Sequence, residues 1–134
     1  MRRALSRGER GQIDSETLLG LAAAAASEVK PTSLVHLDLH GLCSFTDHFL
    51  IASVPSIRQV RAIAERIEER LREERVRMLH REGDLEARWI LLDYSDVIIH
   101  IFDDETRLYY DLEGLWADAP KAELIRLASD GPSR

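Results

Sequence analysis

Residues 88–102 read RWILLDYSDVIIHIF, and this run predicts two strands joined by a tight turn at Tyr94 and Ser95. Side chains alternate between two faces along a strand, and directly opposed residues of a hairpin share a face. One predicted face is entirely apolar and suited to a core, with Ile90, Leu92, Val97 and Ile99. The other face pairs Asp93 with Asp96, Leu91 with Ile98, and Trp89 with His100.

This second face mixes large apolar side chains with two carboxylates and an imidazole. An aromatic anchor with charged groups at its rim is typical of a protein-docking surface. We therefore predict a partner-binding site made of these residues and the turn tyrosine: Trp89, Leu91, Asp93, Tyr94, Asp96, Ile98 and His100. The other interpretation is a sheet covered on both faces, in which Trp89 and Leu91 belong to an ordinary core.

The bulk properties favour a single domain that acts on a protein partner. A chain of 134 residues buries about two-thirds of its unfolded surface. The lone Cys43 forms no internal disulfide, which suits a reducing, cytoplasmic setting. A net charge of −6 argues against broad nucleic-acid binding, which needs clustered cations, and fits a basic protein better. No apolar run is long enough to span a membrane.

The order of predicted elements indicates an α+β fold with one mixed sheet of about five strands flanked by helices. Residues 1–13 predict a flexible basic arm, residues 14–120 the folded domain, and residues 121–134 a short helix or flexible tail. Ser56 and Gln59 have the spacing of a capping box that opens a helix. The remaining predicted elements are a helix from Asp14 or Ser15 to Val29, strands at 34–39, 48–54 and 75–81, and a helical turn at 103–110.

Two groups of side chains raise the question of metal chemistry. His36, Asp38 and His40 alternate, so all three project from one face of their strand, and they offer donors that Zn²⁺ accepts. No second cluster in the sequence completes this set. We therefore expect a solvated strand face and no metal or other cofactor.

Four aspartates raise the alternative of an enzyme. Asp93, Asp96, Asp103 and Asp104 suggest a metal-dependent nucleotidyltransferase or phosphohydrolase. Yet no glycine-rich phosphate cradle precedes them, and they sit at strand ends. The chain also lacks zinc-ligand cysteine pairs and serine hydrolase motifs. We predict that it is not an enzyme and has no catalytic residues.

Several segments, taken together in order and spacing, resemble one known family. They run from about Leu18 to Pro120: Asp38 and Gly41-Leu42 before Thr46–Ala52; Ser56, Arg58–Val60 and Ala62–Ala64; Trp89–Tyr94 and Asp96–Phe102; Tyr110–Glu113 and Leu115-Trp116. In this order they are similar to the ribosomal silencing factors, the Iojap-like proteins. The chain departs from that family at Val54-Pro55 and at Ser95, where the family usually has glycine or small polar residues.

The resemblance implies a non-enzymatic role and a nucleotidyltransferase-like fold without that superfamily's catalytic acids. It implies binding to the large ribosomal subunit through its fourteenth ribosomal protein, which blocks joining of the small subunit and represses translation when nutrients are scarce. Trp89 and Asp93 fall on the family's strand motif, so they are the residues that this partner would contact. The exposed apolar face also leaves a homodimer open, either as a resting state or as a scaffold.

Overall fold

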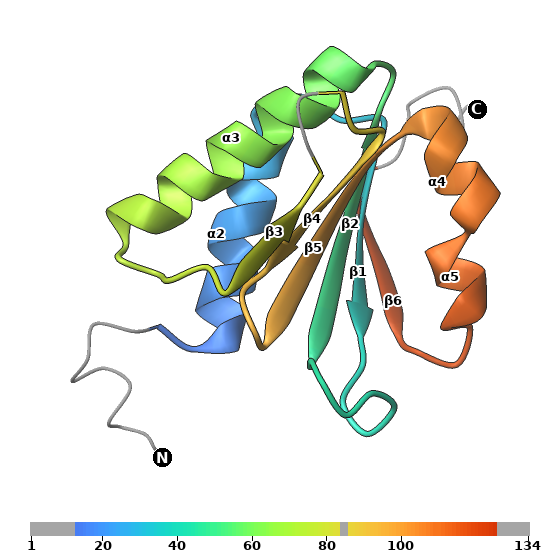
Figure 1. The fold of residues 1–134 in the computed structure, drawn as a ribbon. Helices are drawn as coiled ribbons and strands as arrows, with labels where there is room; N and C mark the ends of the chain where they lie inside the picture. The colour runs from blue at the N-terminus through green and yellow to red at the C-terminus, as the bar shows by residue number, and fades with distance from the viewer. Residues whose placement is uncertain (1–12, 84–85, 126–134) are drawn as a thin grey trace.

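Six strands form one mixed sheet in the computed structural model, which describes residues 13–83 and 86–125 (Figure 1). The strand order is β3-β4-β5-β2-β1-β6. All neighbouring strands are antiparallel except β2 and β5, which run parallel at the centre. The predicted α+β fold is therefore confirmed, with six strands rather than about five. Residues 1–12 of the predicted arm lie outside the described part of the chain.

The strands are β1 (Ser33–Asp38), β2 (His48–Val54), β3 (His80–Glu82), β4 (Trp89–Asp93), β5 (Val97–Asp103) and β6 (Lys121–Ile125). Every residue of β2 and β5 is buried. Near-continuous burial is typical of central strands that are covered on both faces, and it explains why these two segments are so apolar.

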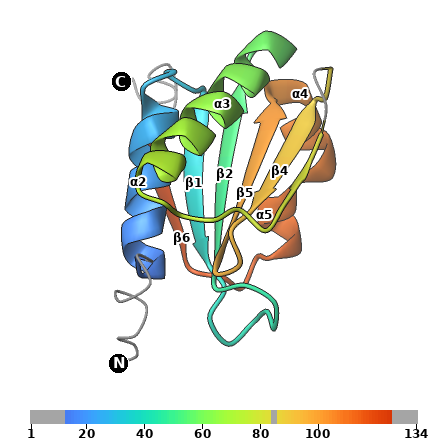
Figure 2. The ribbon, with the colours of Figure 1, turned by 60° about the vertical axis from the view of Figure 1, so that its left-hand side comes forward.

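Two long helices cover one face of the sheet, and two short helices lie on the other (Figures 1 and 2). The long helices are α2 (Ser15–Ser27) and α3 (Ile57–Glu73); the short ones are α4 (Asp104–Tyr110) and α5 (Leu112–Leu115). The predicted cap is present, since Ser56 accepts a hydrogen bond from the Gln59 amide at 3.3 Å. Asp14 caps α2 in the same way and accepts one from the Thr17 amide at 2.8 Å. These side chains satisfy amides that have no partner within the first helical turn.

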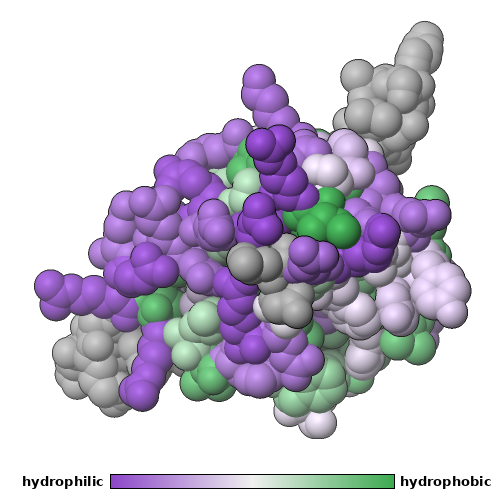
Figure 3. Space-filling view, turned by 45° about the horizontal axis from the view of Figure 1, so that its top comes forward, coloured by the Kyte–Doolittle hydropathy of each residue, from purple (hydrophilic) through white to green (hydrophobic). Residues whose placement is uncertain are grey.

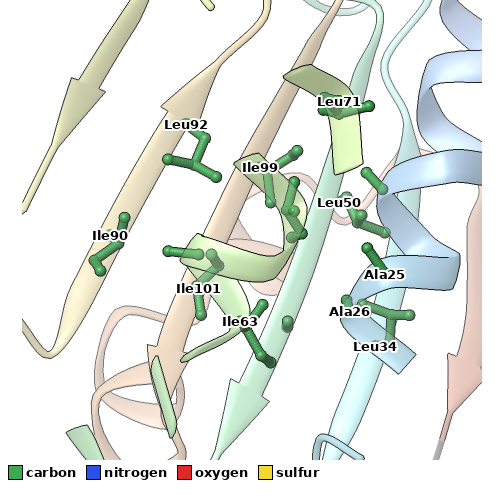
Figure 4. Packing of buried hydrophobic residues seen from close by; sticks show 14 of the residues in the cluster. Ala25, Ala26, Leu34, Leu50, Ile63, Leu71, Ile90, Leu92, Ile99 and Ile101 are labelled. Atoms are coloured by element: carbon green, nitrogen blue, oxygen red, sulfur yellow. The ribbon is translucent and has the colours of Figure 1, made fainter. Parts of the chain in front are cut away.

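The main hydrophobic core lies between α2, α3 and the sheet. Ile63 and other apolar residues of α3 face the sheet residues Leu50, Ile99 and Ile101, all fully buried, as Figure 4 shows. The predicted core face of the hairpin is confirmed, since Ile90, Leu92, Val97 and Ile99 belong to this cluster. A smaller cluster on the opposite face contains Phe49, Ile98 and Phe102.

Two predicted elements were wrong. Residues 75–79 precede the short strand β3 and are not part of it. Residues 121–125 form the edge strand β6 beside β1, and not the short helix or flexible tail that the sequence predicts for 121–134; residues 126–134 lie outside the described part of the chain. The cause is tertiary: β1 presents a free edge, and pairing with it outweighs the helical propensity of Lys-Ala-Glu-Leu.

The hairpin register also differs from the prediction. Ile98 lies opposite Asp93, and Phe102 lies opposite Trp89. The Tyr94 amide donates to the Val97 carbonyl at 3.0 Å, so the turn residues are Ser95 and Asp96. The shift amounts to two residues, which preserves the faces because side chains alternate with a period of two. Tyr94 follows β4, and its ring continues the buried face of Ile90 and Leu92.

Replacing Ser95 by glycine is expected to stabilise the fold. Ser95 has a φ of +76°, which glycine adopts without the steric cost that a Cβ atom imposes. Glycine also has more freedom in the unfolded chain, which offsets part of this gain. We expect a net increase of roughly 0.5–1 kcal/mol in the free energy of unfolding. Urea titration measures it. The control is Ser44→Gly, at a loop residue that does not have a positive φ. It should not stabilise the fold, and a loss of stability at Ser95 would contradict the prediction.

Candidate functional site

Trp89 sits on the outer face of β4, partly exposed and fixed in its orientation. Its indole Nε1 donates a hydrogen bond to His100 Nδ1 at 3.1 Å. Its ring packs against Phe102 and Tyr110, with centroids 4.8 and 4.7 Å away. The contact with Tyr110 brings in α4, but the indole is not sealed by it. Trp89 therefore presents a held aromatic surface, and a held side chain loses little entropy on binding.

His100 lies beneath Trp89 and is only 4% exposed. Burial lowers the pKa of His100 to about 4. The imidazole is therefore neutral at pH 7, and its Nδ1 is free to accept the indole hydrogen bond. Edge-to-face packing with Phe49, at 4.4 Å between centroids, completes its surroundings. His100 thus holds Trp89 in place from the buried side of the indole. It was predicted as a site residue, but it is not at the surface.

The other predicted site residues divide between the two faces and the turn. Leu91 and Asp93 share the face of Trp89 and are half-buried. Ile98 is buried in the smaller cluster, against which Leu112 and Trp116 pack. The outer face of the sheet is therefore covered at its centre, around Ile98, and partly open at β4. The interpretation of a covered sheet describes the centre, and the interpretation of a docking surface describes β4.

Tyr94 and Asp96 are placed differently from Trp89. Tyr94 faces the long helices and is buried there, which raises the pKa of its phenol to about 12. Asp96 is in the turn, and its backbone carbonyl accepts hydrogen bonds from the amides of Asp47 and His48, each at 3.0 Å. The structure therefore does not bring Tyr94 to the face of Trp89.

Helix α4 contributes aromatic residues that the sequence analysis missed. Tyr109 is 81% exposed and Tyr110 is 50% exposed. With Trp89, they help to line an open hollow of about 480 Å³, whose other lining residues are Arg88, Glu105 and Thr106. The sequence signal that could have identified them is the apolar run Leu108-Tyr109-Tyr110 in the segment predicted as a helical turn. We call Trp89, Leu91, Asp93, Tyr109 and Tyr110 the Trp89 surface.

The two sides of the molecule differ in character. In the space-filling view, strongly hydrophilic side chains gather in the left part, whereas the right part is paler and includes hydrophobic residues (Figure 3). The large apolar side chains exposed on α4 and α5 are Leu108, Tyr109, Tyr110 and Leu115. Exposed aromatic and aliphatic side chains that gather in this way mark an interaction site more often than a solvated face.

The aspartates of the enzyme hypothesis are not assembled into a centre. Asp103 caps α4, accepting from the Thr106 amide at 2.8 Å, and pairs with Arg88 at 2.5 Å. Burial raises the pKa of its carboxyl, but these hydrogen bonds outweigh that effect and lower it. Asp93 lies opposite Ile98, five residues from Asp103 along β5, a separation of about 17 Å. A two-metal site needs its metal ions about 4 Å apart.

Within residues 13–83 and 86–125, the possible metal ligands that lie together are Asp38, His40 and His48. They are at the opposite edge of β2 from the Trp89 surface, on β1 and the start of β2.

Within the described residues, 13–83 and 86–125, none of the helices combines the length and apolar character that crossing a bilayer requires.

Comparisons with known proteins agree with one another. A family model described as "Ribosomal silencing factor during starvation" matches residues 12–133. A ribosomal silencing factor of Bacillus subtilis is 39% identical over 112 residues, which cover 84% of this chain and 95% of that protein. The chloroplastic Iojap protein of Zea mays is 32% identical over 102 residues, covering 76% of this chain and 44% of that protein.

Solved structures show the same fold. A crystal structure of a Chromobacterium violaceum protein superposes with a TM-score of 0.76 at 29% identity, covering 87% of this chain and 98% of that one. A Bacillus halodurans structure gives a TM-score of 0.72 at 37% identity, covering 82% and 100%. From the matched family model and the identity to these relatives, we conclude that the chain belongs to the ribosomal silencing factor family.

Proposed function

We propose that this protein binds the large ribosomal subunit through its fourteenth ribosomal protein and thereby prevents the small subunit from joining. Its family membership supports a role in silencing ribosomes. The observation that carries the binding proposal is the Trp89 surface, where a held indole lies beside exposed tyrosines and Asp93 is on the same face of β4. Binding hot spots are enriched in tryptophan and tyrosine at desolvated centres.

The charge of the surface suits a basic partner. Asp93 lies on the same face of β4 as Trp89, at the other end of the strand, and the exposed Glu105 lines the hollow beside Trp89. The whole chain has a net charge of −6. Complementary charge speeds the encounter with a cationic protein and fixes the orientation in which the two dock. To block the subunit interface, the protein only has to occupy it, so the proposed function is non-catalytic. Translation would then fall under nutrient limitation without any chemical step.

Sedimentation of ribosomal subunits tests this function directly. Purified protein is mixed with isolated large subunits, and separately with assembled ribosomes, and each mixture is run through a sucrose gradient. We expect the protein to migrate with free large subunits and not with assembled ribosomes. It should also reduce the ribosome peak when it is added to large subunits before small ones. Migration with neither particle, or unchanged subunit joining, would overturn the proposal.

Charge reversal at Asp93 is expected to weaken large-subunit binding by about 1 kcal/mol, because a lysine there would repel a cationic partner. The loss should shrink at high salt, which screens exposed charges. The matched control is Glu65→Lys, a charge reversal on the exposed face of α3, on the other side of the sheet. Binding measured over a range of salt concentrations distinguishes the two variants. Equal weakening by both would show that net charge, and not this position, matters.

We also propose that the protein forms a homodimer through the exposed apolar side chains of the Trp89 surface. If the Trp89 surface serves both partners, dimers should dissociate when large subunits are added. Analytical ultracentrifugation over a range of protein concentrations measures the monomer–dimer equilibrium. A concentration-independent monomer would remove the dimer from the proposal and leave the ribosome contact unaffected.

A further inference from the structure

Four side chains, from β1, from β2 and from the loop between them, meet at the end of the sheet beside that loop. The antiparallel register puts Asp38 directly opposite His48, and His36 one pair further along the same face. His40 follows β1, and its Nδ1 lies 2.7 Å from Asp38 Oδ1. One ligand atom from each of Asp38, His40 and His48 falls within 4.8 Å of the other two. The sequence pattern around Asp38 and His40 contained no further cluster of ligands. The neighbouring strand β2 therefore supplies the additional ligand, His48.

His48 has a ring nitrogen with no partner. It is only 4% exposed, and its Nδ1 lies 2.9 Å from His36 Nε2, in hydrogen-bond contact. Its Nε2 is buried and makes no hydrogen bond within the described residues. A buried polar atom without a partner costs free energy and calls for an explanation, such as an ion. Since His36 already holds Nδ1, Nε2 is the nitrogen left for a ligand.

We propose that Asp38, His40 and His48 bind a divalent transition-metal ion of the Zn²⁺ class. Two imidazoles and one carboxylate are a donor set that Zn²⁺ accepts, at about 2.0–2.2 Å from each atom. Tetrahedral geometry at those bond lengths separates ligand atoms by about 3.3 Å. Because the three ligand atoms already lie within 4.8 Å of one another, small side-chain movements bring them to this spacing, and the exposed His40 side chain can supply such a movement. Imidazole donors also favour Zn²⁺, Ni²⁺ or Co²⁺ over Mg²⁺ and Ca²⁺.

His36 acts as a positioning residue in this arrangement. A ligating histidine usually has its other ring nitrogen hydrogen-bonded, which fixes the tautomer and the ring orientation. Here Nδ1–H of His48 would donate to His36 Nε2, leaving the lone pair of Nε2 for the metal. His40 has a further neighbour, Asp47 Oδ2, 3.5 Å from its Nε2. This carboxylate either holds His40 as an outer partner or takes a ligand position after a small movement.

The site would join the two ends of the loop of residues 39–47. That loop carries Leu42 and Phe45, both exposed. Asp38 and His48 lie on the sheet face that α2 and α3 cover, whereas Trp89 lies on the other face. Metal binding here is therefore independent of the Trp89 surface, and the inference does not rest on the proposed function.

Metal titration of the full chain tests the site. Protein freed of metal with a chelator is titrated with Zn²⁺ by calorimetry, and with Co²⁺, whose visible absorption reports its coordination. We expect one ion per chain and a tetrahedral-type Co²⁺ spectrum. His40→Ala, at an exposed position, should weaken Zn²⁺ binding at least tenfold, and His48→Gln should abolish the Co²⁺ spectrum. A loss on the order of 10- to 100-fold is expected for His36→Phe, as is usual for an outer partner.

The matched control is His80→Ala. His80 is also exposed and also pairs with a carboxylate two residues away, Glu82, at 2.8 Å, but the described residues place no third ligand with that pair. Zn²⁺ affinity should be unchanged in this variant. Absence of stoichiometric binding, or equal affinity in wild type, His40→Ala and His48→Gln, would overturn the proposal. Equal weakening by His80→Ala would show adventitious surface binding and overturn it as well.

Discussion

Replacing Trp89 by alanine is expected to weaken binding to the large ribosomal subunit by about 2–4 kcal/mol, a loss of roughly 30- to 1000-fold. The substitution removes the indole that anchors the Trp89 surface and also the wall against which Tyr110 packs. Both losses fall at the centre of the proposed contact, where water is most fully excluded. Gradient cosedimentation, or a binding isotherm with a fluorescently labelled chain, measures the change.

Two further variants separate binding from folding. Tyr109→Ala removes a side chain that is 81% exposed, so it should weaken binding while leaving the free energy of unfolding nearly unchanged. Ile63→Val in the main core should cost about 0.5–1.5 kcal/mol of stability and leave ribosome binding intact. If Trp89→Ala and Tyr109→Ala both fold and bind like the wild type, the contact surface has been assigned wrongly.

Acidification is expected to destabilise the fold through His100. Burial lowers the pKa of His100 from its ordinary value of 6.5 to about 4. Between these two values the unfolded chain binds a proton that the folded chain does not, so the free energy of unfolding falls as the pH falls. This stability is complete above pH 6.5 and is lost progressively toward pH 4. The full loss is about 3 kcal/mol.

Unfolding curves at several pH values test this, with His100→Gln and His100→Phe as comparisons. Both variants should flatten the dependence between pH 6.5 and 4, since neither side chain titrates there. Only glutamine retains an acceptor for the Trp89 indole, so it should also retain more of the neutral-pH stability. The lowered pKa of His36 acts in the same direction and the raised pKa of His40 in the opposite one. The difference between wild type and variant isolates His100, and parallel curves would contradict its assignment.

Local patterns in the sequence predicted the scaffold well. The apolar alternation in residues 90–99 identified the core face, and the Ser56 cap marked the start of α3. Alternation is a property of each strand alone, which is why the faces survived a two-residue error in register. The register depended on Tyr94, whose ring continues the buried face and moves the turn to Ser95 and Asp96.

The sequence by itself determined the α+β fold and the two faces of the hairpin, because each follows from interactions between near neighbours. Only the tertiary structure decided that α4 brings Tyr109 and Tyr110 beside Trp89, that β6 pairs with β1, and that His48 joins Asp38 and His40. The first two contacts join segments that are distant along the chain, and the third joins two neighbouring strands through their register. Strand pairing and helix packing create such contacts, and a periodic pattern within one segment contains no information about them.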